Sequence, residues 1–263
     1  MGRLYLNSTR LERLAHELSP KELAILTTLR QLRLVSATQL ERLHFQGDTG
    51  RNRRRVLQSL AERGMVVRLD RVVGGRRAGS AGYLYALGAG GQRLLSQGQD
   101  LRVRRPVTPG APFVAHTLAV TELAVRLSEV ARKGSVEVLG FEAEPRCWRR
   151  HPGPGGGIVT CKPDAFIRLG IGAFEDSWFL EVDRATEGPA TINRQLDAYR
   201  RYWASGIEQS RRGVFPRILW TVPNERRYQA IVDILGRQPA ETWQLHLVTL
   251  YDNAIPMLTE GQS

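Results

Sequence analysis

The sequence predicts an α/β protein, α+β overall, made of two domains of different character. Three observations support this. Positive charge is concentrated in the first part of the chain, where apolar residues recur at helical spacing. The second part alternates strand-like runs with helical ones. Hydrophobic residues make up 42% of the 263 residues, enough to bury the core of two domains.

The net charge of +12 belongs to the first 40% of the chain. Residues 1–105 contain 20 Lys or Arg and 8 Asp or Glu, whereas the remaining residues contain 18 of each kind. A field that strong on one segment attracts a polyanion, so we expect double-stranded DNA as the partner. Most of the positive charges are arginines, whose guanidinium groups match phosphate oxygens.

The sequence predicts a cytoplasmic protein with no membrane partner. No uncharged apolar run reaches the roughly 18 residues that a spanning helix needs. Charged residues interrupt the N-terminal region where a signal peptide would lie. The two cysteines, Cys147 and Cys161, have neither a zinc spacing nor the pattern of a disulfide framework, which favours a reducing compartment.

The first domain is expected over residues 1–95 and opens with three helices. Capping boxes at residues 19–22 and 36–39 begin the first two. Asp48 is expected to cap the third, which ends at Gly64.

Two strand-like runs, residues 65–69 and 83–87, flank a glycine-rich basic tip and predict a hairpin. Three helices followed by a hairpin resemble a winged helix-turn-helix domain, in which the third helix enters the major groove and the wing grips the backbone. The alternative for the arginines is an ordinary solvated face. The DNA-contacting side chains are expected to be Arg51, Arg53, Arg54, Arg55, Arg76 and Arg77.

Residues 96–112 are polar, basic and proline-containing, and are expected to be a linker. The second domain, residues 113–263, is expected to have a central mixed sheet. Its predicted helices are 113–132, 191–203 and 226–235. Its predicted strands are 136–141, 163–169, 178–183, 217–222 and 243–248, and residues 151–157 are expected to be a loop.

An acidic cluster is predicted on two of these strands. If Leu169 pairs with Asp176 in an antiparallel hairpin, the same register places Asp164 opposite Glu181, and Asp183 shares the face of Glu181. Facing like charges destabilise a sheet unless something compensates, and a divalent cation, Mg²⁺ or Mn²⁺, would do so. The alternative is that these carboxylates face solvent or pair with nearby arginines.

The spacing Pro163-Asp164, then Glu181-Val182-Asp183, resembles the PD-(D/E)XK nuclease superfamily. That superfamily normally has a lysine where this chain has Asp183. Either Lys162, two residues before Asp164, stands in for it, or Asp183 acts as a further metal ligand or base.

Gln195 and Tyr199 lie one helical turn apart and resemble the Gln-x-x-x-Tyr motif of RecB-type nucleases, which lines the site. Tyr199 is equally compatible with core packing. The resemblance also implies that Glu122, on the preceding helix, is a further ligand. His116 is expected either to contact phosphate or assist proton transfer, or to be a cap or core residue.

The order of these features resembles the replication-relaxation family of bacterial plasmids and mobile elements, over about residues 19–250. The resemblance implies a role in plasmid replication and DNA relaxation, with a nuclease-like second domain. The expected partners are double-stranded DNA, a second copy of the chain in a homodimer, and replication or conjugation proteins.

Four functions remain open. The first is a metal-dependent DNA endonuclease or nicking enzyme that hydrolyses phosphodiester bonds. The second, motivated by the missing lysine, is a non-catalytic initiator, accessory protein or transcriptional regulator with an inactive nuclease-like domain. A tyrosine relaxase using Tyr199 or Tyr202 is disfavoured because the chain has no His-x-His pair. A small-ligand regulator leaves the acidic cluster unexplained.

Overall fold

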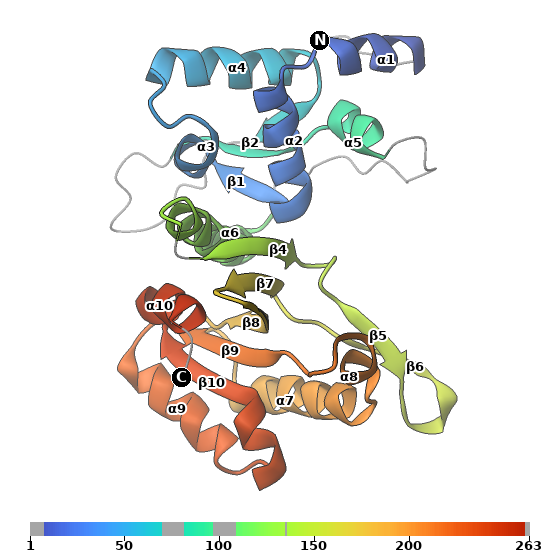
Figure 1. Cartoon of the computed structure of the whole chain (residues 1–263), viewed down its shortest axis with the longest axis vertical. Coiled ribbons are helices and arrows are strands. Elements are labelled where there is room, and N and C mark those ends of the chain that lie inside the picture. The colour runs from blue at the N-terminus through green and yellow to red at the C-terminus, as the bar shows by residue number, and fades with distance from the viewer. Residues whose placement is uncertain (1–7, 70–81, 97–108, 135, 261–263) are drawn as a thin grey trace. The chain divides into compact units, whose positions relative to one another are not determined.

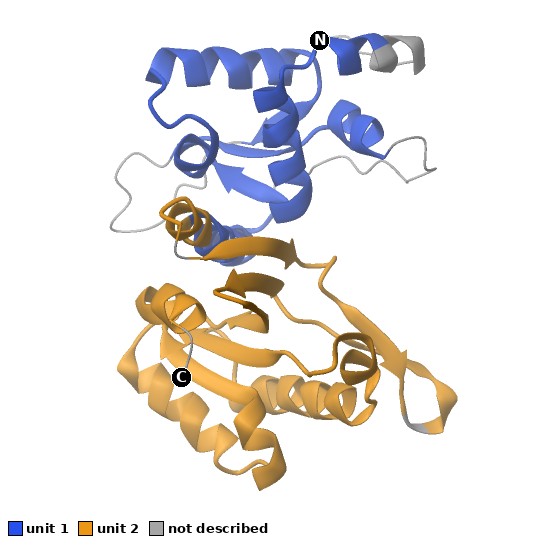
Figure 2. Cartoon of the chain, in the orientation of Figure 1, with its two compact units in different colours: residues 1–125 blue, residues 126–263 orange. Residues whose placement is uncertain are grey.

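The computed structural model describes residues 8–69, 82–96, 109–134 and 136–260. Its contacts divide the chain into unit 1, residues 1–125, and unit 2, residues 126–263 (Figure 2). The α/β class predicted from the sequence is confirmed, because helices and a mixed sheet are both present. None of the described helices is long and apolar enough to cross a membrane.

Unit 1 combines helices with a small antiparallel sheet of order β1-β3-β2 (Figure 1). Its strands are β1 (Leu34–Ser36), β2 (Val66–Leu69) and β3 (Leu84–Leu87). Its helices are α1 (Ser8–Glu17), α2 (Pro20–Leu32), α3 (Ala37–His44), α4 (Gly50–Glu62), α5 (Ala89–Leu95) and α6 (Ala111–Ala131), the last of which continues into unit 2.

The starts of the first two predicted helices are confirmed, because both capping boxes form at residues 19–22 and 36–39. The prediction that Asp48 caps the third helix is wrong. Thr49 caps α4 through its hydroxyl, and the Asp48 carboxylate lies 2.5 Å from Lys21 Nζ. The Asp48 carboxylate therefore binds a lysine 27 residues away instead of the helix N-terminus, and sequence spacing does not reveal that contact.

The hairpin of unit 1 is confirmed in the described residues, where Val66 pairs with Leu87 and Leu69 with Leu84. Its tip, residues 70–81, lies outside the described residues, and so do Arg76, Arg77 and most of the predicted linker. Strand β1 was not expected, because three residues are too few to show a period of two.

Unit 2 is built on a five-stranded sheet of order β10-β9-β8-β7-β4. Strands β8, β9 and β10 are parallel neighbours, whereas β4, β7 and β8 are antiparallel. The strands are β4 (Glu137–Ala143), β5 (Arg149–Pro152), β6 (Ile158–Cys161), β7 (Ala165–Ile171), β8 (Phe174–Val182), β9 (Arg217–Val222) and β10 (His246–Leu250). The helices are α7 (Pro189–Ala204), α8 (Ile207–Arg212), α9 (Glu225–Leu235) and α10 (Ala254–Thr259), with 3₁₀ turns at Pro154–Gly156, Ala240–Leu245 and Tyr251–Asn253.

Two expectations for unit 2 need correction. The segment 151–157, expected to be a loop, contributes to a separate antiparallel ribbon of β5 and β6, and only its glycine-rich tip is a turn. The last strand begins at His246 rather than at residue 243, because residues 240–245 form a 3₁₀ turn. Both errors concern short segments, for which sequence periodicity is a weak signal.

The core of unit 2 lies between one face of the sheet and helices α7 and α9. Phe166, Phe179 and Trp220 come from the sheet, and Ile192 and Leu196 from α7. Helix α7 packs on this face of the sheet. Side chains one turn apart on α7 therefore contact the side chains of β7 and β8 that point to the same face. This packing positions the candidate site.

Candidate active site

Asp164 lies beside Glu181 at the end of the predicted hairpin. Leu169 pairs with Asp176 as expected, and the ladder continues to Ala165 and Leu180. The Asp164 amide donates to the Leu180 carbonyl at 3.0 Å, so Asp164 is bonded to the residue just before Glu181. The Asp164 carboxylate also accepts from the Val182 amide at 2.7 Å.

Glu181 is almost completely buried, with 3% of its surface exposed. Its Oε1 accepts a hydrogen bond of 2.5 Å from the Tyr199 hydroxyl. Burial raises the pKa of Glu181 well above its usual value, and the nearby charge of Asp164 raises it further, whereas the Tyr199 hydrogen bond acts in the opposite direction. Ionising Glu181 in this buried position beside Asp164 is therefore unfavourable.

Tyr199 is a buried core residue as well as a partner of Glu181. Its ring contacts Phe179 at a centroid distance of 5.8 Å. Burial and the Glu181 charge raise the pKa of the Tyr199 hydroxyl well above its usual value. The hydroxyl thus serves as the hydrogen-bond donor to Glu181.

A cavity of about 460 Å³ opens beside Glu181 between β6 and α7. Four predicted site residues line it: Lys162, Glu181, Gln195 and Tyr199. Its other lining residues are Thr160, Cys161, Thr191, Arg194 and Ala198.

Two of the lining side chains, Lys162 and Gln195, bring polar groups to the cavity. The Lys162 Nζ lies 4.9 Å from the centroid of the Trp148 ring, an attractive cation–π geometry. The Oε1 atom of Gln195 is buried and has no hydrogen-bond partner among the described residues. The cavity is therefore lined by the Lys162 ammonium group, by the hydrogen-bonded Glu181 carboxyl and Tyr199 hydroxyl groups, and by the Gln195 amide oxygen. These groups suit a polar ligand.

Asp183 does not line this cavity. It follows the last residue of β8, and Arg227 on α9 binds both of its carboxylate oxygens, one of them from Nη2 at 3.0 Å. The Ala185 amide donates to Oδ1 as well, at 3.1 Å. The alternative of pairing with an arginine thus applies to Asp183, although the partner is not one of its sequence neighbours.

His116 and Glu122 lie on α6 within unit 1. Two side chains of the same unit bind the Glu122 carboxylate: Arg42 Nη1 at 2.5 Å and Gln39 Nε2 at 3.1 Å. Glu122 therefore has an ion-pair role that the sequence analysis did not anticipate. No group of three or more His, Cys, Asp or Glu side chains in the described parts of the chain is arranged to hold a metal ion.

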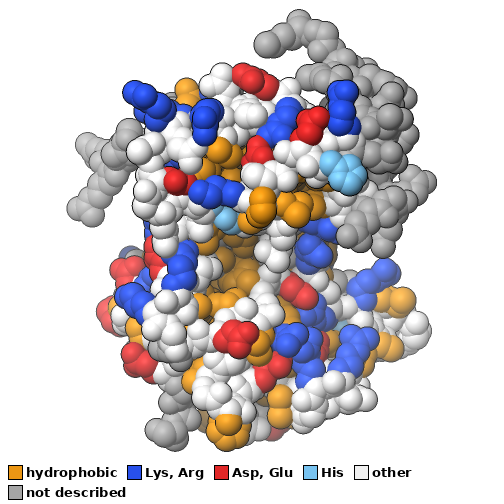
Figure 3. Space-filling view, turned by 45° about the horizontal axis from the view of Figure 1, so that its top comes forward, with side chains coloured by type: hydrophobic (Ala, Val, Ile, Leu, Met, Phe, Trp, Pro, Cys, Tyr) orange, Lys and Arg blue, Asp and Glu red, His pale blue; other side chains and the backbone are white. Residues whose placement is uncertain are grey.

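The basic helix α4 presents three of its four expected DNA-contacting arginines along one groove. Arg51, Arg54 and Arg55 line this groove of about 430 Å³ together with the polar side chains of Gln58, Ser59 and Glu62. Arg53 instead forms an ion pair with Glu41, and its side chain is only 20% exposed. Figure 3 shows one face of the molecule, on which Lys and Arg side chains gather in separate groups with Asp and Glu among them.

A profile described as Replication-relaxation matches residues 26–218, which is more than half of the chain. The chain belongs to the replication-relaxation family. The membership supports a role connected with the replication of plasmids or mobile elements. Comparison with curated proteins gives no match.

The replication-relaxation match ends at residue 218 and so includes the whole cavity, the Asp164 and Glu181 carboxylates and helix α7. Five lining residues of the cavity were not predicted from the sequence: Thr160, Cys161, Thr191, Arg194 and Ala198. A signal was present for the first two, since the β-branched run Ile158-Val159-Thr160 follows a glycine-rich turn and is typical of a strand.

The donor set of this replication-relaxation protein fits a hard divalent cation. Asp164 and Glu181 supply adjacent carboxylates, and the unpartnered Gln195 oxygen lies at the same cavity. Mg²⁺ is commonly held by one or two carboxylates together with water and substrate phosphates, so a third acidic ligand is not required.

Proposed function

We propose that this replication-relaxation protein binds double-stranded DNA through unit 1 and hydrolyses phosphodiester bonds in unit 2 with Mg²⁺ or Mn²⁺. The observation that carries the proposal is the cavity that gathers Lys162, Glu181, Gln195 and Tyr199 beside Asp164. These are the residues that the PD-(D/E)XK and RecB-type resemblances identify. The element order α6, β4, β7, β8, α7, β9 is also compatible with an αβββαβ nuclease core.

The DNA-binding half of the proposal is supported by unit 1. Its helices α2, α3 and α4 and the antiparallel β2–β3 hairpin follow the order of a winged helix-turn-helix domain. In such a domain α4 would enter the major groove. Its exposed groove carries Arg51, Arg54 and Arg55, whose guanidinium groups suit phosphate and guanine contacts.

The chemistry assigned to unit 2 follows from its side chains. Asp164 and Glu181 would hold the cation, which supplies a water of lowered pKa and stabilises charge on the phosphate. Lys162 places an ammonium group at the cavity wall, where it binds a phosphate oxygen and orients the strand. Tyr199 fixes the Glu181 carboxyl group through their 2.5 Å hydrogen bond.

Cleavage of supercoiled plasmid with Mg²⁺ or Mn²⁺ tests the proposal. Asp164→Ala and Glu181→Gln should lose nicking. Glu175→Gln is the matched control, because Glu175 lies on the same strand as Glu181 but is exposed and pairs with Arg168. Equal nicking by the wild type and both site variants would remove the enzyme proposal.

The second candidate is a non-catalytic DNA-binding initiator, accessory protein or regulator. One observation favours it: the position where the nuclease superfamily has lysine holds Asp183, and Arg227 binds that side chain. Metal-independent DNA binding with a steep salt dependence, no nicking, and no heat on Mg²⁺ titration would support this function instead.

A further inference from the structure

A second, smaller cavity adjoins the one beside Glu181. Its volume is about 260 Å³. The two cavities share three lining residues, Thr160, Arg194 and Ala198, so they adjoin one another between β6 and α7, and together they are called the groove. The second cavity is lined further by His151, Val159, Asp197 and Arg201.

One stripe of α7 forms a wall of this groove. Thr191, Arg194, Ala198 and Arg201 recur at intervals of three or four residues and therefore lie on one face of the helix. From Thr191 to Arg201 the stripe extends about 15 Å at 1.5 Å per residue. Arg194 and Ala198 both line the two cavities, so the Arg194 guanidinium group lies where the cavities meet.

The charge of the stripe favours an anion. Arg194 has five N–H donors and makes one hydrogen bond of 3.0 Å to Thr191 Oγ1. Asp197 is the acidic residue of the second cavity, and Arg200 and Arg201 each bind its carboxylate at 2.5 Å. Two guanidinium groups on one carboxylate leave an excess of positive charge.

We propose that this groove holds the sugar-phosphate backbone of a single nucleic-acid strand, with Arg194 and Arg201 as phosphate-binding residues beyond the bond to be cut. The inference rests on the proposed function of unit 2 and adds a binding subsite to it. The second cavity, at about 260 Å³, is smaller than the roughly 300–1,000 Å³ of a typical ligand pocket, so it suits a short stretch of one extended strand and not a duplex.

Arg200 provides a closely matched control for Arg201. Both arginines are on α7, both bind Asp197 at 2.5 Å, and their side chains are 46% and 48% exposed. Only Arg201 lines the groove. Replacing either one removes the same charge and the same type of ion pair. A difference in binding between the two variants therefore measures the contribution of the groove.

The experiment measures the binding of a fluorescent single-stranded oligonucleotide to the full chain in EDTA, so that no cleavage is needed. The background carries Arg51→Ala, Arg54→Ala and Arg55→Ala to weaken binding by α4. Arg201→Ala should raise the Kd several-fold and reduce the salt slope by about 0.7, the value for one phosphate contact on a single strand. Arg200→Ala should change neither quantity.

Equal effects of Arg200→Ala and Arg201→Ala, or no effect of either, would overturn the inference. Its failure is distinguishable from failure of the proposed function, since that function is judged by nicking in the Asp164 and Glu181 variants. A groove that binds DNA without cleavage would leave the subsite standing and remove the enzyme.

Discussion

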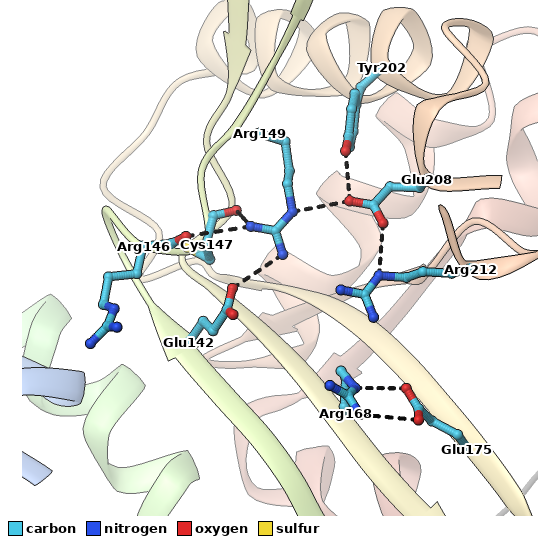
Figure 4. Close-up of polar contacts among 9 residues, drawn as sticks. All are labelled: Glu142, Arg146, Cys147, Arg149, Arg168, Glu175, Tyr202, Glu208 and Arg212. Atoms are coloured by element: carbon cyan, nitrogen blue, oxygen red, sulfur yellow. Dashed lines mark hydrogen bonds and ion pairs between the residues drawn. The ribbon is translucent and has the colours of Figure 1, made fainter. Parts of the chain in front are cut away.

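Removing the Glu208 side chain should lower the free energy of unfolding of unit 2 more than removing any other charged side chain. Glu208 is buried and accepts hydrogen bonds from three side chains. Its side chain is 1% exposed. Oε1 accepts from the Tyr202 hydroxyl at 2.6 Å and from Arg149 Nε at 3.1 Å, and Oε2 accepts from Arg212 Nε at 2.9 Å (Figure 4). Burial raises the pKa of the Tyr202 hydroxyl, and the hydrogen bond from this hydroxyl to Glu208 raises it further.

Replacing Glu208 with alanine removes the buried carboxylate that binds Arg149 and leaves the 46% exposed Glu142, 3.2 Å from Arg149 Nη2, as the remaining acidic partner among the described residues. The Arg149 side chain is 12% exposed, and its guanidinium lies 4.6 Å from the Phe166 ring centroid. Breaking a buried pair by removing one partner costs about 3–5 kcal/mol, which is a large part of the stability of a domain. We expect Glu208→Ala to lower the free energy of unfolding of unit 2 by that amount.

The pair of Arg168 and Glu175 supplies the contrast within the same view. It is bidentate, with distances of 2.7 and 3.2 Å, but its side chains are 36% and 44% exposed. Because exposed pairs contribute about 0.2–1 kcal/mol, Glu175→Ala should cost less than about 1 kcal/mol. Burial, not the number of bonds, decides the difference.

Urea unfolding followed by tryptophan fluorescence measures both variants. The signal reports unit 2, since all of the tryptophans lie in that unit: Trp148, Trp178, Trp203, Trp220 and Trp243. If Glu208→Ala does not fold, Glu208→Gln gives a measurable intermediate loss. Losses within 1 kcal/mol of each other for the Glu208 and Glu175 variants would refute the reasoning.

Three further predictions concern other parts of the chain. Burial lowers the pKa of His246 to about 4, and its Nδ1 accepts from Trp220 Nε1. Because the unfolded chain binds a proton at about pH 6.5, stability should fall as pH falls from 6.5 to 4, by up to about 3 kcal/mol. His246→Gln should flatten that part of the stability profile, and an unchanged profile would count against the burial argument. Burial raises the pKa of both Cys147 and Cys161, so a thiol reagent should label them only after unfolding; labelling of the native chain, detected by mass spectrometry, would contradict this. Arg54→Ala should weaken duplex binding and reduce its salt slope by about 0.9, whereas Arg53→Ala, whose charge is paired with Glu41, should change the slope less; equal slopes would show that the ion pair does not matter.

The strand pairing of this hairpin could be predicted from the sequence because local rules are sufficient for a hairpin. The side-chain period of two and a single assumed pair, Leu169 with Asp176, determine every other pair of the hairpin. The structure extends both strands to a two-residue turn at Gly172 and Ala173, where Gly172 has a φ of 59°. A tighter turn lengthens the strands without changing their register.

The partners of isolated charged residues could not be located, because they come from distant parts of the chain. Asp183 meets Arg227 from another helix, and Glu122 meets Arg42, 80 residues away. Neither pair has a spacing that periodicity could detect. A motif thus predicts which residue types gather on a strand, but tertiary packing decides which of them remain available to a ligand.

Tertiary packing also explains the environment of Asp183, the residue at which the chain departs from the nuclease pattern. Asp183 follows the end of β8, where its amide bonds the Thr221 carbonyl at 2.9 Å and its carboxylate is held by Arg227. Under the proposed function, the ribbon supplies the positive charge that the motif normally has here, since Lys162 directly follows β6 and lines the cavity of Glu181. A cation from a different strand at the same cavity would then balance the carboxylate charge, although the linear motif is broken.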